Sequence, residues 1–226
     1  MRVIAGSAGG IPLKTPDHEA RPTMDRVREA IFSSLGDLVI GARVLDLFAG
    51  SGAFGIEALS RGAAEAVFVD DHPKAITTIQ NNLRKTKLEG QVIRADVFRF
   101  LAGNKERYQL VFADPPYAKR SDDRDFAAEL LGSADLRAAV DGLLILERAP
   151  TKTNQLVGRW EITRAKRYGA TEVLFCVPLE HHAKAEEGSH AKAQKKDLTP
   201  RRQDAKVKKH SVKSPSISSP NSRERA

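Results

Sequence analysis

Runs of apolar residues alternate with helical patterns through the middle of the chain. The runs predict strands, and the segments between them, where apolar residues recur every three or four positions, predict helices. The predicted strands are residues 43–48, 66–70, 91–94, 108–113, 142–147, 159–168 and 171–179. The predicted helices are residues 53–61, 73–86, 97–102 and 123–132. Such alternation favours an α/β fold with a mostly parallel, seven-stranded sheet and helices on both faces. The last two strands predict an antiparallel hairpin at the sheet edge.

The two ends of the chain depart from this pattern. Residues 2–14 predict two short strands around a Gly-rich turn, and residues 24–35 predict a helix with Val27, Ile31 and Leu35 on one face. After Glu180 the chain has almost no large apolar residues and cannot bury enough surface to fold alone. We therefore expect three parts: an N-terminal extension of hairpin and helix (1–41), an α/β domain (42–180) and a disordered basic tail (181–226).

The excess of positive charge is concentrated in the C-terminal part of the chain. The formal net charge is +8, and residues 181–226 contain twelve Lys or Arg against five Asp or Glu. Such a block can hold polyanions such as RNA, although an extension without a role explains it equally well. No segment approaches the ~20 continuous apolar residues of a membrane span, and the start lacks the apolar core of a secretory signal. We expect a cytoplasmic protein, a monomer, without a membrane partner or a metal site.

A glycine-rich turn follows the first predicted strand. Residues 50–55, Gly-Ser-Gly-Ala-Phe-Gly, open a predicted helix, where glycines let the backbone approach a ligand closely. The free N–H groups of a helix N-terminus also favour a polar or anionic group. The match to G-x-G-x-x-G is weak evidence for a dinucleotide site. Asp46 instead favours S-adenosylmethionine, because a carboxylate attracts that ligand's ammonium group and repels a pyrophosphate.

Aspartates also end the next predicted strands, where ligands bind in parallel sheets. Asp70 is placed to accept hydrogen bonds from both ribose hydroxyls, a role that Asp71 could hold instead. Asp96 is placed to accept the adenine amino group, to cap the helix that starts at Val97, or to do both. The predicted cofactor site comprises Asp46, Phe48, Ala49, Gly50, Gly52, Asp70, Asp96 and Val97.

The sequence Asp114-Pro115-Pro116-Tyr117 follows the fourth strand and is the most specific motif in the chain. Two prolines remove two N–H donors and fix the backbone, which leaves carbonyl oxygens free. The Asp114 carboxylate and a proline carbonyl can then accept both hydrogens of a planar exocyclic amine and direct its lone pair at a sulfonium methyl group. Tyr117 can stack on an unstacked base. We therefore predict that these four residues hold the target base.

With these motifs the chain resembles the RsmD family of 16S rRNA guanine-N2 methyltransferases, which have the class I, Rossmann-like fold. The resemblance covers about residues 1–179. The glycine and Asp-Pro-Pro-Tyr motifs occur in many amino-methylating enzymes, and the Arg-Pro-Thr and Arg-Val-Arg-Glu block before the glycines narrows the choice. The matching stretches are residues 2–6, 21–29, 46–52, 57–62 and 114–117.

The resemblance implies methylation of one guanine N2 amine in 16S rRNA, within a small ribosomal subunit or its assembly intermediate. It implies S-adenosylmethionine as cofactor, residues 114–117 around the target base, and Arg21, Arg26 and Arg28 facing RNA. The alternative for the arginines is a solvated helix face with intrahelical ion pairs. The long basic tail departs from the compact family pattern.

Three other classes of protein remain as alternatives. A DNA adenine-N6 or cytosine-N4 methyltransferase also uses Asp-Pro-Pro-Tyr, but usually carries a sizeable DNA-recognition domain. An NAD-dependent oxidoreductase is disfavoured by Asp46. A non-catalytic RNA-binding protein is disfavoured by the intact acids at four strand ends.

Overall fold

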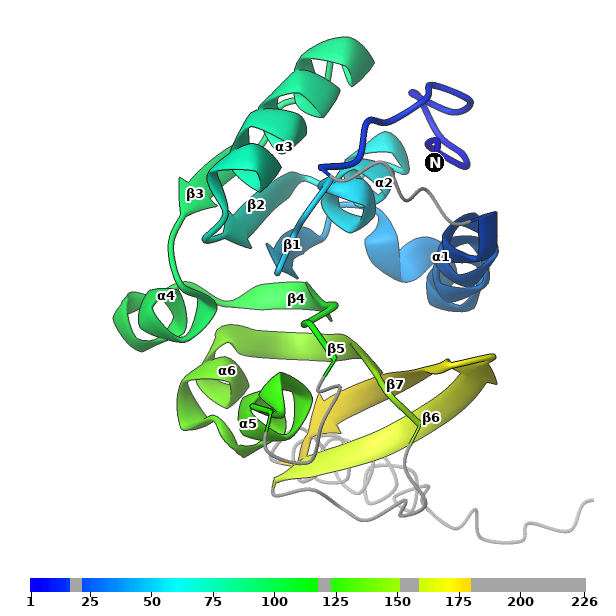
Figure 1. Ribbon diagram of the computed structural model, residues 1–226. Coiled ribbons are helices and arrows are strands. Elements are labelled where there is room, and N and C mark those ends of the chain that lie inside the picture. Colours follow the sequence, from blue (N-terminus) through cyan, green and yellow to red (C-terminus); the bar gives the residue numbers. More distant parts are fainter. Residues whose placement is uncertain (17–21, 118–122, 151–158, 180–226) are drawn as a thin grey trace, which may run out of the picture. The chain divides into compact units, whose positions relative to one another are not determined.

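The computed structural model describes residues 1–16, 22–117, 123–150 and 159–179. They contain one seven-stranded sheet with the order β3-β2-β1-β4-β5-β7-β6 (Figure 1). The strands are β1 (Arg43–Leu47), β2 (Glu65–Asp70), β3 (Gln91–Arg94), β4 (Tyr108–Ala113), β5 (Val140–Arg148), β6 (Trp160–Tyr168) and β7 (Thr171–Pro178). The first five strands pair in parallel, and β7 is antiparallel to both β5 and β6. The predicted mostly parallel sheet with an edge hairpin is confirmed.

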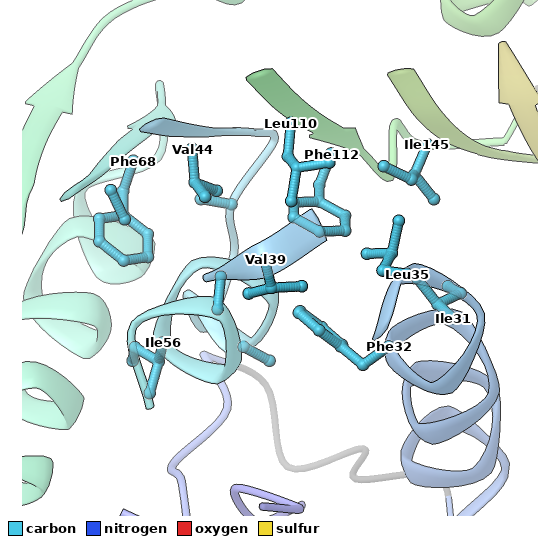
Figure 2. Close-up of a cluster of buried hydrophobic side chains, with 14 of the residues drawn as sticks. Ile31, Phe32, Leu35, Val39, Val44, Ile56, Phe68, Leu110, Phe112 and Ile145 are labelled. Carbon is cyan, nitrogen blue, oxygen red and sulfur yellow. The ribbon is translucent and has the colours of Figure 1, made fainter. Parts of the chain in front are cut away.

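Helices cover both faces of the sheet. They are α1 (Pro22–Leu35), the 3₁₀ helix η1 (Gly36–Val39), α2 (Ala53–Ser60), α3 (Pro73–Thr86), α4 (Val97–Gly103), α5 (Phe126–Gly132) and α6 (Ala134–Ala139). Apolar side chains of α1, α2 and α3 pack on one face, and those of α4, α5 and α6 pack on the other. Figure 2 shows the first of these cores, where the Phe32 ring of α1 lies 5.4 Å from the Phe112 ring of β4.

The side chains of β1 and β4 alternate between these two cores. Val44 and Phe112 belong to the core under α1, α2 and α3, whereas Leu45 and Val111 belong to the opposite core. Strands buried on both faces are expected in a parallel sheet covered by helices. Because successive side chains point to opposite faces, Asp46 lies on the same face as Val44, beneath α2.

The N-terminal segment forms a hairpin-like pairing around one antiparallel bridge, between Arg2 and Pro12, rather than two full strands. It is then fixed to α2 by a buried acid. The Glu57 carboxylate accepts hydrogen bonds from the backbone N–H groups of Ile4, at 2.7 Å, and Ala5, at 3.1 Å. The extension is therefore packed on the domain core.

Two short helices were not expected from the sequence. The 3₁₀ helix η1 directly continues α1, and α6 begins after Ser133, whose hydroxyl accepts a hydrogen bond from the Leu136 N–H at 3.1 Å. Asp125 caps α5 by accepting from the Ala128 N–H at 3.0 Å. In the described part of the chain, none of the helices has the length and apolar character needed to cross a membrane. The predicted basic tail, residues 181–226, lies outside the described residues.

Candidate active site

The site lies where the strand order changes direction. Strand β1 pairs with β2 on one side and with β4 on the other, so the connections after β1 and β4 leave in opposite directions. Ligands bind in such crevices beyond the carboxyl ends of parallel strands. Leu47 pairs with Ala113, and the next residues are Phe48 and Asp114. The pairing thus places the glycine turn beside the Asp-Pro-Pro-Tyr motif.

Positive backbone angles shape the glycine turn. The φ angles of Phe48, Gly50 and Gly52 are 54°, 54° and 74°. Such a φ is unusual for a residue with a side chain, and strained residues of this kind cluster at functional sites. A Cβ atom at Gly50 would have one neighbour within 4 Å, the Phe48 carbonyl oxygen at 3.9 Å. The space beside the Gly50 backbone is therefore open, and its contact with a cofactor remains a prediction.

Asp46 caps the helix that follows this turn. Gly52, at the N-cap of α2, has no side chain to cap the helix, and the Asp46 carboxylate accepts a hydrogen bond from the Gly55 N–H at 2.9 Å. Asp46 is 2% exposed. Burial raises the pKa of its carboxyl group to about 8, with smaller contributions from the charges of Asp114 and Asp70 and a lowering by the Gly55 N–H. The Asp46 carboxylate is thus hydrogen-bonded to one of the N–H groups at the helix N-terminus, which the sequence analysis expected to be free for a ligand.

Asp70 joins β2 to the glycine turn. One carboxylate oxygen accepts from the Gly50 N–H at 2.9 Å, and the other accepts from the His72 N–H at 2.8 Å. Asp70 is half-buried, whereas Asp71 is exposed. Ala49, the residue before Gly50, donates its N–H to the Val69 carbonyl at 3.1 Å. The ribose role of Asp70 or Asp71 remains a prediction.

Asp96 and Val97 lie at the start of α4. The exposed Asp96 caps this helix by accepting from the Arg99 N–H at 2.9 Å. Val97 is buried in the core under α4. The capping role that the sequence allowed for Asp96 is therefore present, and its contact with adenine remains a prediction.

The Asp-Pro-Pro-Tyr motif contains two groups whose acid–base behaviour is altered by burial. Desolvation raises the pKa of the half-buried Asp114 to about 6. Tyr117 donates its hydroxyl hydrogen to Thr171 Oγ1 at 3.0 Å, and burial raises the pKa of Tyr117 to about 12. Pro115 is buried and Pro116 is exposed. Tyr117 is therefore a neutral phenol that joins this turn to β7.

Glu147 is an acid beside the candidate site that the sequence interpretation missed. Leu146 pairs with Ala113, so Glu147 of β5 lies next to Asp114. Burial and the charge of Asp114 raise the pKa of Glu147 to about 8, and the charge of Arg28 opposes this rise. Glu147 is an acid at the end of an apolar run, like the aspartates that the sequence analysis selected at the other strand ends. The same signal could therefore have identified it.

The arginines predicted to face RNA are not equivalent. Arg28 is 2% exposed, donates to Asp25 Oδ1 at 2.9 Å and to the Arg2 carbonyl, and lies 3.7 Å from Glu57 Oε2. The prediction that Arg28 faces RNA is wrong in this structure, because its guanidinium is an internal partner of these acids. Arg26 is exposed, and its contact with RNA remains a prediction; Arg21 lies outside the described residues.

Sheet order and motif positions define the class. A sheet with the order 3-2-1-4-5-7-6, a glycine turn after β1, an acid ending β2 and Asp-Pro-Pro-Tyr after β4 form the class I, Rossmann-like methyltransferase fold.

Comparison with known proteins identifies the family. The model of the family described as "Conserved hypothetical protein 95" matches residues 1–177, and the chain belongs to this family, the RsmD type of S-adenosylmethionine-dependent methyltransferases. The resemblance inferred from the motifs is confirmed.

Named relatives and a solved structure agree with this assignment. "Putative rRNA methyltransferase YlbH" of Bacillus subtilis (strain 168) is 40% identical over 184 residues, which cover 77% of this chain and 97% of that protein. "Ribosomal RNA small subunit methyltransferase D" of Escherichia coli (strain K12) is 39% identical over 121 residues, which cover 53% of this chain and 61% of that protein. The structure titled "Putative methyltransferase yhhF from Escherichia coli" has a TM-score of 0.69 and 29% identity, covering 79% of this chain and 97% of that chain.

Proposed function

We propose that this protein transfers the methyl group of S-adenosylmethionine to the exocyclic N2 amine of one guanine in 16S rRNA, within a small ribosomal subunit or its assembly intermediate. The observation that carries the proposal is the position of Asp114 beside the glycine turn, across the pairing of Leu47 with Ala113. A site for the amine and a site for the methyl donor then adjoin at one sheet edge.

The charges around the glycine turn favour a cationic ligand. Asp46 interacts electrostatically with both Asp70 and Asp114. Burial raises the pKa of Asp46 to about 8, and a bound ammonium or sulfonium group would favour the ionised form of this carboxyl group. A pyrophosphate beside these carboxyl groups would be repelled as they ionise, which disfavours a nicotinamide dinucleotide. The cofactor supplies a methyl group on positively charged sulfur. Asp46 would hold its amino-acid end, while Asp70 and the open backbone at Gly50 would hold the ribose end.

The Asp-Pro-Pro-Tyr turn supports methylation of an amine. An aromatic exocyclic amine is a weak nucleophile because its lone pair is delocalised into the ring. An Asp114 oxygen and the Pro115 carbonyl can accept its two hydrogens, which favours rehybridisation and aims the lone pair at the methyl group. Methyl transfer releases one N–H proton, and the Asp114 carboxylate that accepts one of the amine hydrogens can take it up, with its pKa raised to about 6.

The relatives support rRNA as the substrate. The E. coli relative is named for the small ribosomal subunit, and the B. subtilis relative is named for rRNA. The guanine N2 amine follows from the family resemblance, and this amine carries the two hydrogens that the Asp114 turn can accept. A DNA amino-methyltransferase is the alternative that shares the same turn.

The test is methyl transfer from labelled S-adenosylmethionine to three substrates: small ribosomal subunits that lack guanine-N2 methylation, protein-free 16S rRNA and duplex DNA. We expect label in the subunits above that in the other two. Label in DNA alone would assign the protein to the rival class. A protein that binds no S-adenosylmethionine in a calorimetric titration would contradict the enzymatic function itself.

A further inference from the structure

We propose that the outer strand of the sheet, β6, is a docking surface for the rRNA backbone beside the target base, with Arg164 and Lys166 as phosphate contacts. The inference rests on the proposed function and adds the surface that the substrate would occupy. The arginines chosen from the sequence lie in or before α1, and none of them lies on this strand.

Strand pairing connects β6 to the catalytic edge. Ala113 pairs with Leu146, Leu146 with Leu174, and Leu174 with Ala165. The next row along the sheet contains Glu147, Val173 and Lys166, and it starts beside Asp114. Neighbouring strands are about 4.8 Å apart, so the backbone of Lys166 lies roughly 14 Å from that of Asp114. Figure 1 shows β6 as the outermost strand at this end of the sheet.

Arg164 and Lys166 point to the same face as Asp114. Residues paired on adjacent strands share a face, and the partners of Arg164 and Lys166 are Phe175 and Val173. Both partners belong to the core under α1, α2 and α3, as does Phe112, two residues before Asp114. The Arg164 guanidinium lies 5.9 Å from the centre of the Phe175 ring. Aromatic packing holds the side chain in place while its charged head stays exposed.

These two cations are not neutralised by the hairpin. The acid of β7, Glu172, is paired with Arg148 at 2.8 Å, and Arg167 donates to the Gly169 carbonyl. Within the described segments, neither Arg164 nor Lys166 has an ion-pair partner. Arg164 is exposed and Lys166 is half-buried. Strand β6 contains three basic residues, Arg164, Lys166 and Arg167, against one acid, Glu161, and its net positive charge complements a phosphate backbone.

A hydrogen bond joins this surface to the base-holding turn. Tyr117 donates to Thr171, the first residue of β7, and Thr171 pairs with Tyr168, the last residue of β6. RNA bound along β6 would thus enter the site over a continuous, hydrogen-bonded sheet edge. Basic residues on an edge strand can also serve only to prevent pairing with another sheet, and the experiment distinguishes the two roles.

The test compares two double variants of the full chain. Arg164→Ala with Lys166→Ala removes the proposed contacts. Lys105→Ala with Arg107→Ala removes the same formal charge at the opposite, amino-terminal edge of β4, where both side chains are exposed and Arg107 is paired with Asp141 at 2.9 Å. The affinity for small subunits and for protein-free 16S rRNA is measured at several salt concentrations. The loss of two phosphate contacts should reduce the steepness of the plot of log affinity against log salt concentration by roughly 1.4. At 0.1 M salt this change lowers the affinity by about 25-fold.

The control variant should keep the wild-type slope, and both variants should keep the affinity for S-adenosylmethionine. Arg164→Gln with Lys166→Gln, which removes the charges but keeps a polar side chain on the strand, should repeat the loss. Equal slopes for wild type and the β6 variants would overturn the docking surface and leave the proposed function standing. Binding to rRNA that depends on β6, with methylation only of DNA, would overturn the proposed function and support the surface. Wild-type protein without affinity for rRNA would overturn both.

Discussion

At the scale of single residues, Asp114 is expected to act on the base rather than on the cofactor. Asp114→Ala removes the acceptor for the amine hydrogens and should lower kcat by about 100-fold or more, by analogy with loss of a preorganised hydrogen-bond partner. The dissociation constant for S-adenosylmethionine should stay within about threefold of wild type. Rapid-mix kinetics and calorimetry measure the two quantities.

Asp114→Asn, which keeps one acceptor oxygen, is the matched control and should lose less activity. Equal losses of turnover and cofactor affinity in Asp114→Ala would contradict this role.

Asp46 should make folding stability depend on pH. Burial raises its pKa to about 8, so the folded state binds its proton more tightly than the unfolded state does. The contribution of the protonated Asp46 to folding stability is therefore fully present below about pH 4, which is the ordinary pKa of an aspartate, and it is lost as the pH rises through about 8.

Asp46→Asn removes this ionisation but keeps an oxygen for the Gly55 N–H. The variant should lose less stability than wild type between pH 5 and pH 9, with a Tm higher by about 3 °C or more at pH 9. Thermal unfolding across that range, with Glu147→Gln as a second carboxyl variant, measures the difference. Parallel curves for wild type and Asp46→Asn would show that Asp46 does not titrate as its burial requires.

The sequence identified those residues whose position follows from strand ends. Asp46, Asp70 and Asp114 could be located because each lies in or after an apolar run, and parallel strands end at one edge. The burial of Arg28 could not be predicted, because it depends on Glu57 of α2 and the Arg2 carbonyl, which are brought to α1 only by folding.

At the scale of elements, close packing of α2 on β2 requires a residue without a side chain at position 55. A Cβ atom on Gly55 would lie 2.3 Å from Phe68 Cε1, whereas one on Gly103 of α4 would have no neighbour within 4 Å. Gly55→Ala should therefore reduce the free energy of unfolding by about 1–3 kcal/mol. Gly103→Ala should change it by less than about 0.5 kcal/mol or slightly stabilise. Urea unfolding of both variants tests this, and equal stabilities would contradict the packing.

Periodicity predicted the main elements and missed those set by tertiary contacts. The strands and the helices α2, α3 and α4 were expected close to their observed bounds. The short helix α6 has too few residues to show a helical period, and η1 continues α1 beyond Gly36, where the sequence predicted a stop. The register between β6 and β7 includes a shift between Ile162 and Arg164. Sequence alternation alone therefore could not assign Arg164 to a face.

At the scale of the described fold, a buried acid of α2 connects the N-terminal segment to the helices that pack on the sheet. Glu57 is fully buried and contacts the segment at Ile4 and Ala5 while it pairs with Arg61 at 2.7 Å. Asp46 of β1 holds the first turn of the same helix by accepting a hydrogen bond from the Gly55 N–H. The sheet order places the proposed amine site, the proposed donor site and the proposed β6 surface at the carboxyl-terminal edge of the parallel strands. The sequence predicted a mostly parallel, seven-stranded sheet but not the strand order, so the proposed role of β6 follows only from the pairing in the structure.

The most direct test of the central proposal is the identity of the methylated nucleoside. Small subunits that lack guanine-N2 methylation are incubated with the protein and labelled S-adenosylmethionine, and the rRNA is digested and separated by chromatography with mass detection. The proposal predicts label in N2-methylguanosine from a single position. Label in a methylated adenosine or cytidine, or in several guanosines, would contradict the assigned reaction.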